Sequence, residues 1–329
     1  MSAAELGPLP HIDAANLDRL MPMSRAVSAL EDMLRAGVLD ADDTMPRTAA
    51  DVGAGQLLFM PAESGPYAGV KLVSVAPGNA ARGLPRITGL YVLLDSETLL
   101  PRALLDGAAL TALRTPAVSA LAVDRLAVPE AARLVVFGTG PQAWRHVEAA
   151  RLVRPVGDVG VVARDAGRIS AFLDRCRGAG LRATRVGPEA VRQADIVLCC
   201  TTAREPLFPG RLVPGHATVV AVGSHEPDAR EVDSELVRRS TVVVESRGAA
   251  LREAGDIVLP VSAGEWRPES IAGDLAELVA GRVGIGPAVP RLFKSVGMAW
   301  EDLAVAAGAY ERLRKSPGPT AGPGVAVQH

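Results

Sequence analysis

The stretch Ala132-Arg133-Leu134-Val135-Val136-Phe137-Gly138-Thr139-Gly140-Pro141-Gln142-Ala143 joins an apolar run to a turn with two glycines. This order predicts a buried strand, a glycine turn and then a helix over Gln142 to Val153. Gly138 permits the tight turn, and Gly140 lets the backbone approach a pyrophosphate. A helix N-terminus offers free N–H groups to phosphates, so we expect a dinucleotide here. The candidate cofactor contacts of this turn are Gly138, Thr139, Gly140, Pro141, Gln142 and Ala143.

A second apolar run, Val159 to Ala163, follows about twenty residues later and ends in Arg164-Asp165. An NAD enzyme usually places a lone acid at this strand end, where it binds the ribose. Arg164 instead suits a 2′-phosphate, because a guanidinium offers a fixed charge and bidentate geometry. We therefore expect NADP, with NAD possible if Arg164 is only solvated and Asp165 takes the ribose hydroxyl.

Composition limits the function classes. The 329 residues are 48% hydrophobic and 22% charged, which is ordinary for a globular protein with room for two domains. The formal charge of −2 gives no basic footprint for nucleic acid or an anionic membrane. Met1 to His11 lack a signal pattern and no apolar run is long enough to span a membrane, so we expect a cytoplasmic protein.

Neither the cysteines nor the histidines indicate a metal site. Cys176, Cys199 and Cys200 have no metal-ligand spacing, and we expect them to be small buried hydrophobes in a reducing compartment. The five histidines form no HxxxH or HExxH pattern. We therefore expect no bound metal.

The order of the elements predicts an α/β fold. Helical spacing runs from Leu17 to Leu39 and from Leu110 to Leu126, with turn-separated strands between them that indicate an antiparallel sheet. From Arg133 onward strands and helices alternate, which is typical of a Rossmann-type doubly wound parallel sheet. The expected strands there are 134–137, 159–163, 183–186, 196–200, 218–222 and 241–244.

The C-terminal part of the chain is expected to fold back and pack against the N-terminal domain. Phe293 to Tyr310 has the pattern of one long apolar-faced helix, and the Pro- and Gly-rich tail from Ser316 to His329 is expected to be disordered. We predict a smaller α+β substrate-binding and dimerisation domain from residues 1–122 with 297–329. Residues 123–296 form the predicted NAD(P)-binding Rossmann domain.

Three cations stand in apolar or turn-like surroundings: Arg47, Lys71 and Arg114. A cation within a strand or helix that faces a core needs an anionic partner. The carboxylate of a small substrate would supply one, although each cation taken alone could equally be solvated or ion-paired.

Several motifs, in this order, resemble the ornithine cyclodeaminase/mu-crystallin family over about Arg47 to Leu303. They are Arg47-Thr48, Lys71 with Pro77-Gly78-Asn79, Leu110-Thr111-Ala112-Leu113-Arg114-Thr115, Gly138-Thr139-Gly140-Pro141-Gln142-Ala143, Val222-Gly223-Ser224-His225-Glu226-Pro227-Asp228, Gly273-Asp274-Leu275 and Phe293-Lys294-Ser295-Val296-Gly297.

The resemblance implies a homodimer whose first domain, closed by the C-terminal helix, forms the subunit contact and the substrate pocket. It also implies that Arg47, Lys71 and Arg114 hold the α-carboxylate of an amino or imino acid. The further cofactor contacts that we carry over, or add from the matched motifs, are Arg86, Arg114, Thr202, Val222, Gly223, Ser295 and Val296.

Two positions depart from the ornithine cyclodeaminase branch, which has acids where this chain has Leu58 and His225. Leucine cannot pair with a substrate ammonium, so ornithine cyclisation is disfavoured. We expect NAD(P)H to reduce the C=N bond of an open or cyclic 2-imino acid, such as pyrroline- or piperideine-2-carboxylate. His225 is the candidate proton donor, if its pKa stays near the ordinary 6.5, and Lys71 polarises the substrate.

Three alternatives stay open from the sequence alone. The chain could be an NAD-dependent ornithine cyclodeaminase that releases proline and ammonia. It could bind NADP(H) and a small carboxylate without turnover, as mu-crystallins bind hormone. It could also act on a larger imine, because the pocket has room where Leu58 and Gly69 lie.

Overall fold

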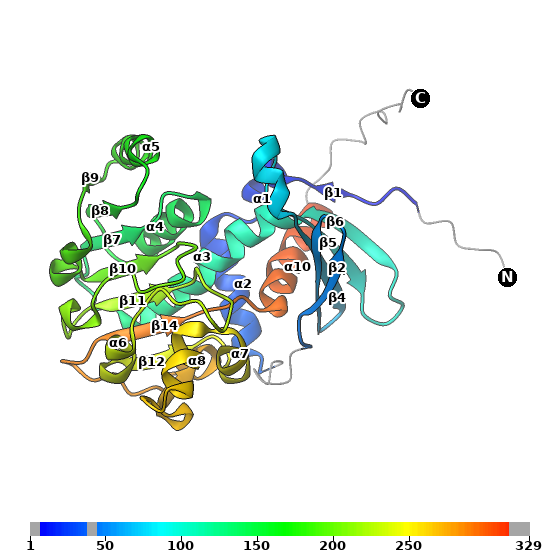
Figure 1. The fold of residues 1–329 in the computed structure, drawn as a ribbon. Coiled ribbons are helices and arrows are strands. Elements are labelled where there is room, and N and C mark those ends of the chain that lie inside the picture. The colour runs from blue at the N-terminus through cyan, green and yellow to red at the C-terminus, as the bar shows by residue number, and fades with distance from the viewer. Residues whose placement is uncertain (1–6, 38–44, 316–329) are drawn as a thin grey trace.

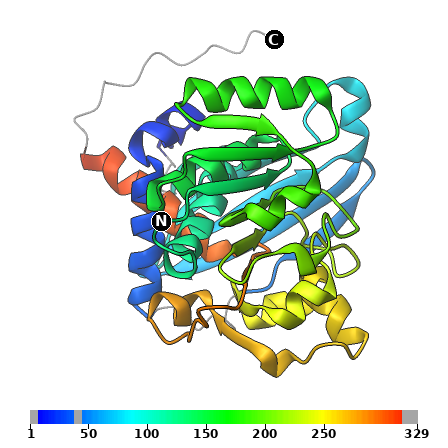
Figure 2. The same cartoon turned by 90° about the vertical axis from the view of Figure 1, so that its left-hand side faces the viewer.

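Eight parallel strands form the larger of two sheets. The computed structural model describes residues 7–37 and 45–315. In the eight-stranded sheet the order is β13-β12-β14-β11-β10-β7-β8-β9, and every neighbouring pair is parallel (Figure 2). Its strands are β7 (Arg133–Phe137), β8 (Asp158–Val162), β9 (Arg182–Arg185), β10 (Ile196–Cys199), β11 (Thr218–Ala221), β12 (Thr241–Val244), β13 (Ile271–Asp274) and β14 (Arg291–Lys294). The predicted α/β, Rossmann-type class is confirmed.

Both faces of this sheet are buried, which explains its continuous apolar runs. Along β7, Leu134 and Val136 face one apolar cluster while Val135 and Phe137 face another. The helices that accompany these strands are α4 (Pro141–Val153), α5 (Ala166–Gly178), α6 (Ser234–Arg239), α7 (Arg247–Glu253), α8 (Gly255–Ser262) and α9 (Leu275–Val279). Short 3₁₀ turns are η1 (Pro77–Arg82), η2 (Pro188–Gln193), η3 (Gly210–Leu212) and η4 (Pro268–Ser270).

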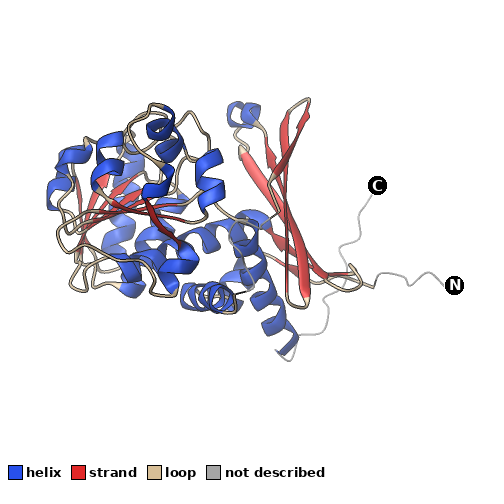
Figure 3. Cartoon of the chain, turned by 90° about the horizontal axis from the view of Figure 1, so that it is seen from below, coloured by secondary structure: helices blue, strands red, loops and turns tan. Residues whose placement is uncertain are grey.

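A second sheet has six strands in the order β1-β6-β5-β4-β3-β2. Strands β2 to β6 are antiparallel neighbours, as the turn-separated runs predicted, and β1 pairs parallel with β6. The bounds are β1 (His11–Ile12), β2 (Thr48–Val52), β3 (Gly55–Ser64), β4 (Tyr67–Val75), β5 (Ile87–Asp95) and β6 (Pro101–Asp106). Figure 3 shows this sheet apart from the parallel one, with helices between them.

Four helices lie against the inner face of the six-stranded sheet or beside it: α1 (Ala14–Leu20), α2 (Met23–Arg35), α3 (Gly107–Leu126) and α10 (Ala299–Lys315) (Figure 1). The helical spacing that begins at Leu17 covers two helices, which are separated at Met21–Pro22. One cluster of buried apolar side chains includes Leu93 of β5, Leu121 of α3 and Val136 of β7. The core is thus continuous from one sheet to the other.

The single helix predicted from Phe293 to Tyr310 is wrong at its start. Arg291–Lys294 is strand β14, inserted between β11 and β12, and α10 begins only at Ala299. Gly297 lies between them with a φ of +84°, a conformation that glycine adopts without strain and that interrupts a helix. A strand of four residues, of which only Leu292 and Phe293 are apolar, is too short to show a periodicity that separates strand from helix, which explains the error.

The predicted domain boundaries fall between the two sheets, because β7 begins at Arg133 and β14 ends at Lys294. The division into residues 1–122 with 297–329 and 123–296 stays a prediction, as does disorder of residues 316–329, which lie outside the described residues. Cys176 and Cys199 are buried, Cys200 is half-buried, and all three are free thiols, as expected. Within residues 7–37 and 45–315 no helix is long and apolar enough to cross a membrane.

Candidate functional site

The glycine turn after β7 has the geometry that its sequence predicted. Gly138 has a φ of +106°, and a Cβ there would lie 2.5 Å from the carbonyl oxygen of Cys200. Its N–H donates to Val162 O at 2.9 Å. By contrast, a Cβ on the exposed Gly140 would meet nothing within 4 Å, so open space lies over the start of α4. Pro141 is the first residue of that helix and Ala143 is buried beneath it, which leaves room for a pyrophosphate.

Glu231 joins two neighbouring loops at the same sheet edge, and sequence reasoning missed it. Its buried carboxylate accepts hydrogen bonds from Thr201 N at 2.8 Å, Thr201 Oγ1 at 2.7 Å and Gly223 N at 2.7 Å. These bonds hold the loop after β10 against the loop after β11. The candidate residues Thr202, Val222 and Gly223 therefore lie on loops beside the glycine turn, at the carboxyl ends of β10 and β11.

The strand end at Arg164-Asp165 separates the two cofactor hypotheses. Asp165 caps α5, since its Oδ1 accepts the N–H of Arg168 at 2.9 Å. Arg164 is exposed just before it. The acid is thus already engaged by the helix that follows it, while the guanidinium is open to solvent.

Lys71 and Arg114 are buried and have anionic partners within the chain. Lys71, on β4, places its Nζ 2.6 Å from Asp302 Oδ2 and 3.2 Å from Thr111 Oγ1. Arg114, on α3, places its Nη1 2.5 Å from Glu301 Oε2 and its Nε 3.4 Å from Asp302 Oδ1. The anionic partners that these buried cations need thus include two acids at the start of α10, as the ion-paired alternative expected, and their role toward a substrate carboxylate stays a prediction.

The three cations nevertheless converge on one segment, residues 295–302, which we call the crossing segment because it leads from β14 of the eight-stranded sheet into α10. Arg47 Nη2 donates to the carbonyl oxygens of Val296 at 3.1 Å and Gly297 at 3.0 Å. A Cβ on Gly297 would lie 2.7 Å from Nη1 and Nη2 of Arg114. Lys71 and Arg114 both approach Asp302. The predicted clamp residues thus come together.

Glu245, directly after β12, holds the first part of the crossing segment. Its Oε1 accepts from Ser295 Oγ at 2.8 Å, and its Oε2 accepts from the N–H groups of Val296 at 3.1 Å and Gly297 at 2.6 Å. Sequence reasoning also missed this residue. The sequence did contain a signal, because Glu245 directly follows the apolar run Val242 to Val244. An acid next to a buried strand is expected to be buried too, and a buried carboxylate needs hydrogen-bond donors.

The glycine turn and the clamp are linked through Thr111 of α3. Gln142 Nε2 donates to the Thr111 carbonyl oxygen at 3.3 Å, and the Thr111 hydroxyl contacts Lys71. The start of α4 and the buried lysine are therefore separated by a single residue. This places Lys71 next to the edge where the glycine turn opens.

His225 lies after β11 on a loop that a buried ion pair supports. Lys294 Nζ donates to the Ser224 carbonyl oxygen at 2.6 Å and lies 2.9 Å from Asp256 Oδ2. Desolvation, and then the positive charges of Arg47, Lys294 and Arg86, lower the pKa of His225, although the residue is exposed at the loop surface. These charges place His225 near Arg47 and Arg86, and its role as proton donor stays a prediction.

Burial also changes the pKa of Lys71. It lowers that pKa to about 8, with Arg114 acting in the same direction and Asp302 opposing. Burial likewise raises the pKa of Glu301 well above the usual range for a carboxyl, and the negative charge of Glu245 adds to this. The site therefore contains one amine that titrates near neutral pH.

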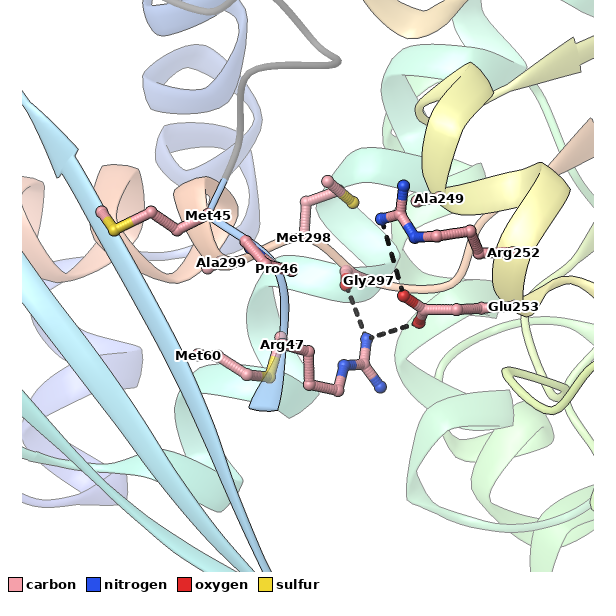
Figure 4. A pocket seen from close by; sticks show the side chains of 10 residues that line it. All are labelled: Met45, Pro46, Arg47, Met60, Ala249, Arg252, Glu253, Gly297, Met298 and Ala299. Atoms are coloured by element: carbon pink, nitrogen blue, oxygen red, sulfur yellow. Dashed lines mark hydrogen bonds and ion pairs between the residues drawn. The ribbon is translucent and has the colours of Figure 1, made fainter. Parts of the chain in front are cut away.

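A pocket with a cavity volume of about 20 Å³ opens beside Arg47. Figure 4 shows Arg47 directed toward Gly297 and Glu253, with Met60 and Met298 nearby. Glu253 Oε2 lies 3.6 Å from Arg47 Nη2. The pocket thus has apolar side chains on one side and a charged pair on the other. Among the described residues no group of His, Cys, Asp and Glu could hold a metal ion.

The chain belongs to the ornithine cyclodeaminase/mu-crystallin family, whose model matches residues 13–317. It is 33% identical over 310 residues to the Delta(1)-pyrroline-2-carboxylate/Delta(1)-piperideine-2-carboxylate reductase of Azospirillum brasilense, covering 94% of this chain and 97% of that protein.

Two solved structures share the fold over nearly their whole lengths. Delta(1)-pyrroline-2-carboxylate reductase of Thermococcus litoralis, in complex with NADH and L-proline, superposes with a TM-score of 0.86 at 32% identity, covering 93% of this chain and 98% of that one. An archaeal alanine dehydrogenase dimer with bound NAD gives a TM-score of 0.88 at 29% identity, covering 94% and 98%.

Proposed function

We propose that this protein is an NAD(P)H-dependent reductase of the C=N bond in 2-imino acids, with cyclic ketimine carboxylates as its substrate class. The observation that carries the proposal is the position of the buried Lys71, which is linked to the glycine turn through Thr111 alone, and burial lowers the pKa of this lysine to about 8. Relatives of known structure and sequence named for pyrroline-2-carboxylate reduction support it.

The residues of the clamp divide the work between binding and proton transfer. Arg47 and Arg114 approach Gly297 and bind the substrate carboxylate in this scheme. Lys71 donates a proton to the imine nitrogen, because an amine with a pKa of about 8 is mostly protonated at neutral pH yet can release its proton. When bound, the reduced nicotinamide supplies the hydride to the imine carbon. Asp302 holds Lys71 toward the site.

His225 has a smaller part in this scheme than we expected from the sequence. Its lowered pKa leaves it mostly neutral at pH 7, where it accepts a hydrogen bond more readily than it donates a proton. We therefore place it at the wall of the pocket beside Arg47 and Arg86, and keep Lys71 as the first candidate for the proton donor.

We propose NADP as the preferred cofactor, with its 2′-phosphate at Arg164. The exposed guanidinium and the use of Asp165 as a helix cap both support this assignment. The pyrophosphate then lies over the turn from Gly138 to Gln142, and Ala143 packs beneath it. The loops that carry Arg86, Thr202, Val222, Gly223, Ser295 and Val296 form the remaining contacts in the proposal.

Ornithine cyclodeamination fits the pocket less well. Leu58 pairs in register with Val73, on the same face of the six-stranded sheet as Met60 and Lys71. A leucine at this position gives a substrate's distal ammonium no carboxylate. The apolar wall formed with Met60 suits the methylene groups of a ring.

We propose a homodimer that forms through the outer face of the six-stranded sheet. Phe59, Leu72 and Leu90 are register neighbours on this face, opposite the row of Met60, Lys71 and Tyr91. Phe59 and Leu90 are each 36% exposed. A face this apolar is typical of a subunit interface. The cytoplasmic location stays a prediction, and the free thiols support it.

The test follows NADPH absorbance with pyrroline- and piperideine-2-carboxylate. Oxidation of NADPH with formation of the cyclic amino acid is the expected result. Tight NADPH binding without turnover on any imino acid would instead favour a ligand-binding protein. Release of proline and ammonia from ornithine with NAD would restore the cyclodeaminase hypothesis.

A further inference from the structure

Five charged side chains form a buried cluster around the crossing segment: Lys71, Arg114, Glu245, Glu301 and Asp302. None of them is more than 5% exposed. The cluster contains two cations and three acids, so full ionisation would leave one uncompensated negative charge in the interior. Such a charge costs several kcal/mol, whereas one retained proton makes the cluster neutral. Outside the cluster, Glu253 lies 3.6 Å from Arg47 and 3.9 Å from Arg252, and Arg252 is exposed to solvent.

The contacts indicate which acid keeps the proton. Both oxygens of Glu245 accept bonds from Ser295, Val296 and Gly297. Two buried carboxyl oxygens of the cluster, Glu301 Oε1 and Asp302 Oδ1, meet no hydrogen-bond donor in the part of the chain that the structure describes. Asp302 Oδ1 nevertheless lies 3.4 Å from Arg114 Nε, whereas Glu301 has only the bond that its Oε2 accepts from Arg114. The Glu301 carboxyl lies within hydrogen-bonding reach of the Glu245 carboxyl. A proton on Glu301 would therefore satisfy the oxygen that lacks a partner.

We propose that Glu301 keeps its proton and donates it to Glu245, so that the two carboxyls form one positioning unit. The unit joins Arg114, on α3, to the backbone of residues 295–297. This proposal rests on the proposed function, in which Arg114 binds the substrate and Ser295 and Val296 lie along the cofactor.

Burial and the Glu245 charge, which raise the pKa of Glu301, agree with this placement. Arg114 opposes the rise, and Asp302 contributes to it. Lys71 of β4 also faces the cluster, where Asp302 is its nearest partner. A carboxyl with a raised pKa in the folded protein stabilises the fold below its ordinary pKa. That contribution is lost as the pH rises through the raised value.

Loss of the proton has two expected consequences. The two ionised carboxyls repel each other, which loosens residues 295–297 against Arg114. The extra negative charge also opposes entry of a substrate carboxylate. The affinities for imino acid and dinucleotide should therefore fall together at alkaline pH, whereas deprotonation of Lys71 alone lowers the turnover number.

The experiment compares wild type with Glu301→Gln and Glu301→Ala between about pH 6 and pH 10, a range that spans the Lys71 pKa and extends well above the ordinary glutamate pKa. Glutamine keeps an N–H donor toward Glu245 without a titratable proton, and alanine removes the donor. Glu97→Gln, an exposed glutamate in a turn of the six-stranded sheet, is the matched control for loss of one negative charge. The readouts are melting temperature, NADPH binding by fluorescence and the KM for pyrroline-2-carboxylate.

In wild type and Glu97→Gln we expect KM to rise about tenfold at alkaline pH, with a parallel loss of NADPH affinity. Glu301→Gln should show less than about a twofold change over the same range and should bind more tightly than Glu301→Ala. The same pH dependence in Glu301→Gln as in wild type would overturn the proposal. Equal losses in the glutamine and alanine variants would do the same. The melting and NADPH readouts need no turnover, so an inactive enzyme would count against the proposed function alone.

Discussion

The glycine turn and the buried clamp meet at one site but are built in different ways. The turn is made of backbone: Gly138, Gly140 and the first residues of α4 set its shape, and the neighbouring side chains are small. The clamp is made of long cationic side chains, and two of them, Lys71 of β4 and Arg114 of α3, contact acids of α10. A backbone site is defined by local sequence, whereas a site of paired charges depends on contacts between distant residues. Changes in the clamp should therefore alter catalysis most.

Lys71→Met should have the largest effect. We expect a loss of about a thousandfold in the turnover number, because the proton donor to the imine is gone, while NADPH affinity changes little. In wild type, kcat/KM should decline as the pH rises through about 8, where Lys71 loses its proton. Steady-state kinetics against pH measures both effects. A variant that kept most of its turnover would assign the proton to another group.

Arg47→Ala should raise the substrate KM by about a hundredfold, because a charge-assisted contact to the carboxylate is lost. Arg47→Lys should recover only part of this loss. The planar guanidinium of arginine can contact the Val296 and Gly297 carbonyl oxygens and a carboxylate at the same time, whereas the ammonium of lysine cannot. Initial rates over a range of imino acid concentrations test the pair. An unchanged KM in both variants would exclude Arg47 from the clamp.

The two glycines of the turn separate stability from binding. Gly138→Ala should lower the free energy of unfolding by about 1 to 3 kcal/mol, because φ is positive and a Cβ would approach the Cys200 carbonyl. Gly140→Ala should leave the melting temperature unchanged, since its Cβ meets only open space, yet weaken NADPH about tenfold. Thermal melts and fluorescence titrations distinguish them. Equal melting losses would mean that the space over α4 is not free.

Arg164→Ala should weaken NADPH about tenfold and leave NADH almost unaffected, because only NADPH carries the 2′-phosphate. Dissociation constants for the two dinucleotides test this directly. Equal losses would show that the phosphate is recognised elsewhere.

His225→Asn should have the smallest effect, within about fivefold on kcat/KM, if the histidine only lines the pocket. Asparagine keeps a polar group of similar reach. A loss as large as that of Lys71→Met would return His225 to the role of proton donor that the sequence suggested. The kinetics of the two variants should be measured side by side.

The contrast between the glycine turn and the clamp also explains which features could be predicted from the sequence. Strands β7 to β12 and the glycine turn follow from apolar runs and glycine spacing, which are local patterns. Arg47, Lys71 and Arg114 were singled out by their apolar or turn-like surroundings, and the family resemblance then joined them into one set. Their partners Glu301 and Asp302 lie about two hundred residues away in sequence, and no periodicity reports such a pairing. Strand β14 was missed for the related reason that four buried residues look alike in a helix or a strand.

The crossing segment also limits how the substrate range of this enzyme can be changed. Residues 295–302 contact Arg47, Arg114 and Lys71 on one side and Glu245 on the other. Under the proposed function, a substitution there alters both the position of the cofactor and the binding of the carboxylate, so most would be lost in a screen for new activities. Leu58 and Met60 on β3 do not belong to this segment, which contacts the cations and Glu245 together. Libraries aimed at bulkier rings should therefore randomise β3 and leave the crossing segment untouched.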